Sequence, residues 1–206
     1  MNKKPFPLLA CSIALVLTGC SGPPPEATKK APEKPPEPVT GQSALWKMFQ
    51  VARAWAPDAE ILKVSTIHLT EVPEAPGKAG AWEATFTSAA KGRAKSYTYS
   101  VIEGPGTLHQ GVFGAPEEDY TPRPDATPFP IAAVKTDTDA ALNMALANGG
   151  YDYEKKTPRK IISFVLEKLP KFANPAWRVI WGESAGTSSF SIYVDATADD
   201  FLERLH

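Results

Sequence analysis

One order of elements occurs twice in this 206-residue chain, and that repetition limits the folds open to it. In each half, apolar residues recur at every third or fourth position, as in an amphipathic helix. Runs of alternating apolar and polar residues follow, as in half-buried strands. The second such strand opens on Trp82 or Trp177, and the third contains Tyr99 or Tyr193. Because a helix can cover the apolar face of a sheet, we predict an α+β fold of two tandem helix-on-antiparallel-sheet modules.

The periodicities place two helices and six strands. The first helix covers residues 43–55 and stops before Pro57, and the second follows a cap at Thr136 or Asp137 and ends at 148–150, Asn-Gly-Gly. The predicted strands are 61–69, 82–87, 97–101, 160–169, 177–181 and 190–194.

These elements give a first module over residues 42–114 and a second over 136–206. We interpret residues 115–135 as a connector, because proline lacks the backbone N–H that helices and central strands need. The pattern leaves open whether the two modules share one sheet. The prolines of the connector are Pro116, Pro122, Pro124, Pro128 and Pro130.

The first 20 residues have the order of a bacterial export signal. Lys3 and Lys4 precede an apolar run over residues 8–17, and the stretch 17–20 reads Leu-Thr-Gly-Cys. An apolar core of about 10–13 residues is typical of a signal peptide and shorter than the roughly 20 residues that span a bilayer. The alternative is a buried N-terminal helix of a soluble protein.

Residues 17–20 resemble the lipobox of bacterial lipoproteins. The resemblance implies that residues 1–19 are removed as a signal peptide and that Cys20 carries a diacylglycerol and a further acyl chain, such as palmitate. Each buried methylene contributes roughly 0.8 kcal/mol, so two or three chains give a firm membrane anchor. Ser21 stands where the family's inner-membrane retention signal is an aspartate. The resemblance therefore favours the outer membrane of the cell envelope, at its periplasmic face or surface.

Residues 20–41 form a predicted tether behind the acylated cysteine. The stretch 22–40 contains seven prolines, and its three lysines balance its three glutamates. Proline favours the extended polyproline II conformation, and this composition cannot bury a core. We expect a disordered, semi-rigid spacer. The alternative is a ligand segment for a proline-recognition domain.

Composition excludes several classes of function. Without Lys3 and Lys4, 20 basic residues face 23 acidic ones, a net charge of about −3, which argues against a nucleic-acid partner. Cys11 lies in the predicted signal peptide and Cys20 would be acylated. The predicted mature chain therefore lacks a thiol nucleophile, a thiolate metal site and a disulfide.

The second half is similar to PepSY and PepSY-like domains, which have a cystatin-like fold. The stretches that carry this resemblance are 140–142, 175–179 and 193–197, the last leading to an apolar pair at 201–202. Asp199 replaces the glycine that is usual in the closing turn, and aspartate tolerates the left-handed conformation better than most residues. The resemblance implies an extracytoplasmic binding module without catalytic residues, of a kind proposed to modulate peptidases.

We predict no catalytic, cofactor-binding or metal-binding residues. His68, His109 and His206 are scattered and lack the spacing of a metal site. The acidic run at 117–119 does not follow the spacing of a calcium loop, and we interpret it as a solvated loop.

Residues 182–186, Gly-Glu-Ser-Ala-Gly, meet the G-x-S-x-G pattern of serine hydrolases. That motif belongs on a strand–turn–helix, whereas the predicted context here is strand–turn–strand. We interpret the stretch as a hairpin turn and keep a hydrolase that uses Ser184 as an alternative.

Of the five tryptophans, we assign Trp55, Trp82 and Trp177 to the core, and Trp46 and Trp181 as candidate partner-binding anchors. The sequence thus predicts a lipid-anchored, non-catalytic lipoprotein that binds an envelope protein or peptide in a groove or at a sheet edge. A structural or assembly lipoprotein without a ligand is the other alternative. Membrane lipid is the partner of acylated Cys20.

Overall fold

The computed structural model describes residues 35–73, 75–158 and 161–205. The first half contains β1 (Val39–Thr40), α1 (Gly41–Trp55), β2 (Glu60–Ile67), β3 (Lys78–Ala79), β4 (Ala81–Ser88), β5 (Arg93–Ser100) and β6 (Gly111–Asp119). The second half contains the 3₁₀ turn η1 (Ile131–Ala133), α2 (Thr138–Ala145), the π-helical segment η2 (Leu146–Gly150), α3 (Tyr151–Lys156), β7 (Ile162–Glu167), β8 (Ala176–Trp181), β9 (Ser191–Asp195) and β10 (Phe201–Leu205).

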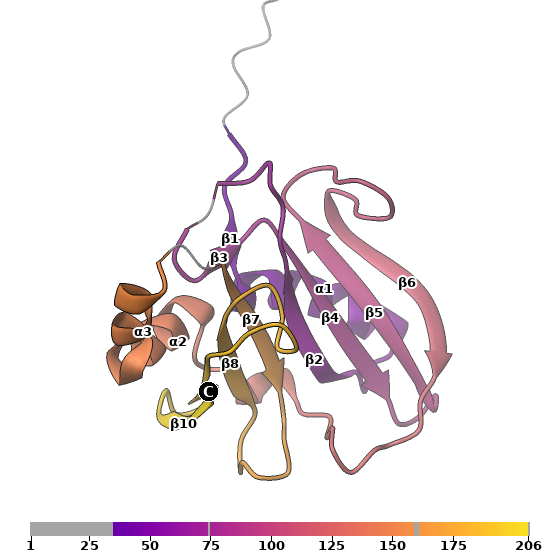
Figure 1. Cartoon of the computed structure of the whole chain (residues 1–206). Coiled ribbons are helices and arrows are strands. Elements are labelled where there is room, and N and C mark those ends of the chain that lie inside the picture. The colour runs from indigo at the N-terminus through magenta and orange to yellow at the C-terminus, as the bar shows by residue number, and fades with distance from the viewer. Residues whose placement is uncertain (1–34, 74, 159–160, 206) are drawn as a thin grey trace, which may run out of the picture. The chain divides into compact units, whose positions relative to one another are not determined.

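In the described part of the chain, eight strands form one antiparallel sheet in the order β10-β9-β8-β7-β2-β4-β5-β6 (Figure 1). Each half supplies four strands to this sheet, and the strands of each half follow one another from the centre of the sheet to one edge. The first strands of these two sets, β2 and β7, pair antiparallel at the centre, with Val64 opposite Leu166. The α+β architecture with a large antiparallel sheet is confirmed. The two tandem modules are not confirmed as separate bodies, because the halves share one sheet within one compact unit that begins at Pro35.

Three aromatic side chains hold the halves together beneath the helices. Phe164 of β7 lies 6.1 Å from Trp82 of β4 and 6.5 Å from Trp177 of β8, measured between ring centroids, and the two indoles are 6.4 Å apart. All three rings are at most 2% exposed and belong to one continuous hydrophobic core. The predicted assignment of Trp82 and Trp177 to the core is confirmed.

The same two tryptophans also fix where each helix begins. The indole N–H of Trp82 donates to the carbonyl oxygen of Val39 at 3.1 Å, and that of Trp177 donates to Thr136 at 2.8 Å. Each acceptor lies two residues before the first residue of its helix, Gly41 or Thr138. The two tryptophans therefore occupy equivalent positions in the two halves.

The predicted equivalence of Tyr99 and Tyr193 is wrong by one residue. Tyr99 lies opposite Trp82, whereas the residue opposite Trp177 is Val194. Successive side chains of a strand point to opposite faces, so Tyr193 faces away from the helices.

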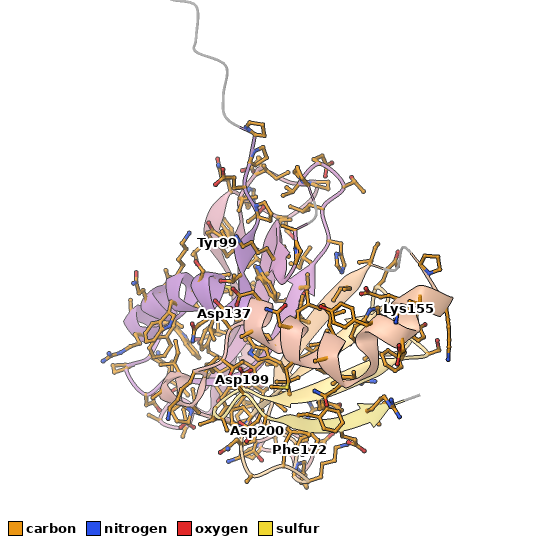
Figure 2. The ribbon with its side chains drawn as sticks, turned by 90° about the vertical axis from the view of Figure 1, so that its left-hand side faces the viewer. Tyr99, Asp137, Lys155, Phe172, Asp199 and Asp200 are labelled. Carbon is orange, nitrogen blue, oxygen red and sulfur yellow. The ribbon has the colours of Figure 1, made fainter. Side chains whose placement is uncertain are left out.

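The N-termini of α1 and α2 meet at Asp137, from which the helices extend in opposite directions (Figure 2). One carboxylate oxygen of Asp137 accepts from the N–H of Thr138 at 2.7 Å and from the N–H of Gln42 at 2.9 Å. The hydroxyl oxygen of Thr138 accepts from the N–H of Gly41 at 2.9 Å. Asp137, one of the two predicted caps, thus caps its own helix and the other one.

The predicted connector 115–135 is wrong at both of its ends. Residues 115–119 belong to the edge strand β6, so the first half extends past residue 114 and the acidic run 117–119 is not a loop. Pro116 is tolerated because the register shifts between Lys95 and Tyr97 of the neighbouring strand, and an edge bulge needs no N–H there. Phe129 bridges to Ile61 and is buried in the core.

Of two turns singled out in the sequence, one differs from the prediction and one agrees with it. The Asn-Gly-Gly stretch does not end the helical region. It only interrupts it: Gly149, with a φ of 125°, breaks the helical geometry, and the chain then continues as α3. Asp199 has a φ of 61°, so the left-handed turn expected there is confirmed.

At the N-terminal side, residues 39–41 of the predicted tether belong to β1 and α1. The predicted signal peptide and Cys20 lie outside the described residues.

Gly41→Ala should destabilise the fold by about 1–3 kcal/mol, the usual cost of overpacking a core. A Cβ at this position would lie 2.7 Å from a methyl carbon of Thr138 and 2.9 Å from the indole of Trp177. Chemical denaturation measures the change in the free energy of unfolding. Gly186→Ala is the control, because nothing lies within 4 Å of a Cβ there. Equal stability of the two variants would contradict the tight packing at the helix junction.

Candidate functional site

A cleft of about 480 Å³ opens between the two halves of the fold. One wall is the connection from β2 to β4, which includes β3 and lies near α2 and α3 in Figure 1. The opposite wall comes from α2, α3 and the start of β7. Most of the lining is apolar: Ile67, Leu69, Val72, Leu142, Leu146, Ile162 and Phe164.

The β2–β4 connection is held in place by close backbone contacts. β1 pairs with β3, with Val39 opposite Ala79. The hydroxyl of Thr138 donates to the carbonyl oxygen of Gly77 at 2.5 Å. Gly77 has a φ of 69°, and a Cβ there would lie 2.4 Å from the Cα of Asp139. Only glycine allows this approach, so the first turn of α2 fixes one wall of the cleft.

Glu154 of α3 contributes a carboxylate to the lining. The indole N–H of Trp181 donates to its Oε1 at 2.9 Å. Trp181 is 1% exposed, and its ring meets Phe190 at 5.0 Å and Tyr153 at 6.3 Å. The prediction that Trp181 is an exposed partner-binding anchor is therefore wrong, because α3 covers it. The sequence analysis did not predict α3, because it took the Asn-Gly-Gly stretch as the end of the second helix.

His68, at the end of β2, also lines the cleft, although its isolation in the sequence gave it no role. Its Nε2 lies 2.7 Å from the hydroxyl oxygen of Ser163. That hydroxyl has one hydrogen, which goes to the carbonyl oxygen of Gly182 at 2.6 Å. Nε2 of His68 is therefore the donor to Ser163. A general base would have to accept from the serine, so the pair has the wrong polarity for nucleophilic catalysis.

The stretch 182–186 connects β8 to β9, the strand–turn–strand context that we predicted. Ser184 is exposed, and its hydroxyl lies 2.9 Å from that of Thr187. Its carbonyl oxygen accepts from the N–H of Ser188 at 3.1 Å, as in a closed turn.

Trp46, the other candidate anchor, is 45% exposed on α1. Its ring meets Phe49 edge-on at 5.9 Å, and a shallow depression beside it also includes Gln50 and Arg53. Trp46 is not part of the cleft, so the structure does not bring the two predicted anchors together.

The acidic run lies on β6 and makes structural contacts. The indole N–H of Trp55 donates to Glu117 at 2.8 Å, and this hydrogen bond holds the pKa of that carboxyl below its ordinary value. Arg93 pairs with Asp119. Among the described residues, no group of three or more His, Cys, Asp or Glu side chains could hold a metal ion.

No family model and no curated protein matches the chain. One solved structure is similar, a protein of Clostridium difficile 630 described as a "putative lipoprotein (CD1622)". The alignment has 8% identity and a TM-score of 0.45, and it covers 84% of this chain and 95% of the other. These values do not establish a shared fold, so the lipobox and PepSY-like resemblances stay predictions from the sequence. No helix in the described residues is long and apolar enough to cross a membrane.

We expect a fluorophosphonate probe, which labels activated serines, to label neither Ser163 nor Ser184. Ser163 already donates to a carbonyl, and among the described residues the side chain of Ser184 contacts no histidine or carboxylate but the hydroxyl of Thr187. Mass spectrometry of the treated protein measures labelling, and a known serine hydrolase treated in parallel is the positive control. Labelling that is lost in Ser184→Ala would instead favour the hydrolase alternative.

Proposed function

We propose that this chain is a lipid-anchored, non-catalytic lipoprotein of the cell envelope, and that its folded part binds an apolar peptide segment of another envelope protein in the cleft. The observation that carries the proposal is the cleft itself. Its volume of about 480 Å³ lies in the range of ligand-binding pockets, and its walls are apolar with few polar groups.

Both edges of the sheet are less suitable for a peptide strand than the cleft. β6 contains Pro116, which has no N–H to offer, and the acidic run 117–119. β10 carries Glu203 and Arg204. Proline, charges and bulges are the features by which proteins protect sheet edges from added strands. Of the two binding surfaces expected from the sequence, the groove is therefore favoured.

The anchor and the location rest on the sequence. The stretch 17–20 supplies the lipobox pattern, and Ser21 supports the outer membrane over the inner one. A tethered peptide-binding protein without catalytic residues fits a role as a modulator of an envelope peptidase, as the PepSY-like resemblance implies. A structural lipoprotein without a ligand would leave the cleft unused.

Expression in a bacterial host should give a membrane-bound product whose mass corresponds to residues 20–206 plus acyl chains. Cys20→Ala should lose the acyl chains and the processing, because no other cysteine follows the apolar run. Fractionation and intact mass spectrometry measure both. An unprocessed, soluble wild-type product would contradict the anchor.

The cleft is tested with acetyl-leucyl-leucine amide, an uncharged apolar peptide, added to the processed protein in nanodiscs. We expect saturable binding by calorimetry, and Leu146→Trp should weaken it by about tenfold or more because the indole would fill the cleft. Ala147→Trp is the matched control, since Ala147 is exposed and outside the lining. No saturable binding to the wild type, or equal binding by Leu146→Trp, would refute the cleft as the binding site.

A further inference from the structure

The carboxylate of Glu154 is held in a fixed orientation at the wall of the cleft. Its Oε1 accepts from the buried indole of Trp181 at 2.9 Å, and an indole N–H can only donate. In residues 35–73, 75–158 and 161–205, no hydrogen-bond or ion-pair partner contacts Oε2. The Glu154 residue as a whole is half-buried.

The surroundings of Glu154 favour a cation as its missing partner. Apolar side chains of η2 and β7, among them Leu146 and Ile162, line the same cleft. A carboxylate beside hydrocarbon loses part of its hydration, and a charge-assisted hydrogen bond restores it. Lys78 also lines the cleft but is exposed, and in the described part of the chain no ion pair joins it to Glu154. His68, the other titratable group of the lining, is held through Ser163.

We propose that Glu154 binds an ammonium group, and that the ligand of the cleft is an apolar chain that ends in a primary amine. This inference rests on the proposed function of the cleft and specifies the end of the ligand that it recognises. The ammonium donates to Oε2 of Glu154 while Trp181 holds Oε1, and the adjoining apolar groups contact Leu142, Leu146 and Phe164. A peptide N-terminus and a simple alkylamine share this chemistry.

The experiment compares leucyl-leucine amide, which has a free amine, with its acetylated form on the processed protein in nanodiscs. We expect the wild type to bind the free amine about tenfold tighter or more. Glu154→Gln should abolish this preference, because glutamine keeps an oxygen that accepts from Trp181 but carries no charge for the ammonium. Asp152→Asn, which removes an exposed charge from the same helix, is the matched control and should keep the preference.

The outcomes separate the two proposals. Equal binding of both peptides by the wild type, or an unchanged preference in Glu154→Gln, refutes the ammonium site and leaves the cleft as an apolar binding site. Binding of neither peptide refutes the proposed function and this inference together. Hexylamine distinguishes the sources: affinity equal to that of the peptide indicates a simple amine, and weaker binding indicates a peptide N-terminus.

A second measurement does not depend on the stability of a variant. In the wild type, the indole proton resonance of Trp181 should shift more on titration with leucyl-leucine amide than with the acetylated form, because only the free amine contacts the carboxylate that accepts from the indole. Identical shifts with both peptides would refute the role of Glu154.

Discussion

The rest of this fold depends on the hydrogen bonds that the carboxylate of Asp137 accepts from the first turns of two helices. Two helix N-termini, each with unpaired N–H groups and a partial positive charge, meet at one point near the centre of the molecule. Asp137 accepts an N–H from each of them, and the neighbouring Thr138 accepts from Gly41. Without a shared anion, the two positive helix ends would repel each other there. The same threonine donates to Gly77, so the junction also positions the wall of the cleft.

The sequence predicted those parts of the fold that depend on local pattern. The alternation around Trp82 and Trp177 and the cap at Asp137 follow from rules that act over a few residues, whereas the turn at Asp199 was expected from the PepSY-like resemblance. β6 was missed because Pro116 argues against a strand unless the bulge beside it is known. The equivalence of Tyr99 and Tyr193 failed because strand register is set by pairing across the sheet.

The cleft could not be predicted, because its walls come from segments that are distant in the sequence. Glu154 meets Trp181 only because α3 resumes after the turn at Gly149, and His68 meets Ser163 only because β2 pairs with β7. Both contacts depart from the repetition of the two halves. α3 has no counterpart before β2, and the β2–β4 connection, which contains β3, is longer than the β7–β8 connection. The cleft thus lies where the two halves of the pattern differ from each other.

The central pairing of β2 with β7 has a consequence for how the chain reaches its native state. Residues about 100 positions apart must meet before either half is complete. The N–H of Gln42 donates to the carboxylate of Asp137, and the N–H of Phe164 donates to the hydroxyl of Thr66. Contacts of such long sequence separation slow folding, because the entropy of closing the chain is lost before they form. Until the second half is in place, the first half exposes the inner edge of β2, and the N–H groups of Gly41 and Gln42 lack their acceptors Thr138 and Asp137. We therefore expect the two halves to acquire much of their stability together, because each contributes contacts that the other lacks when it is alone.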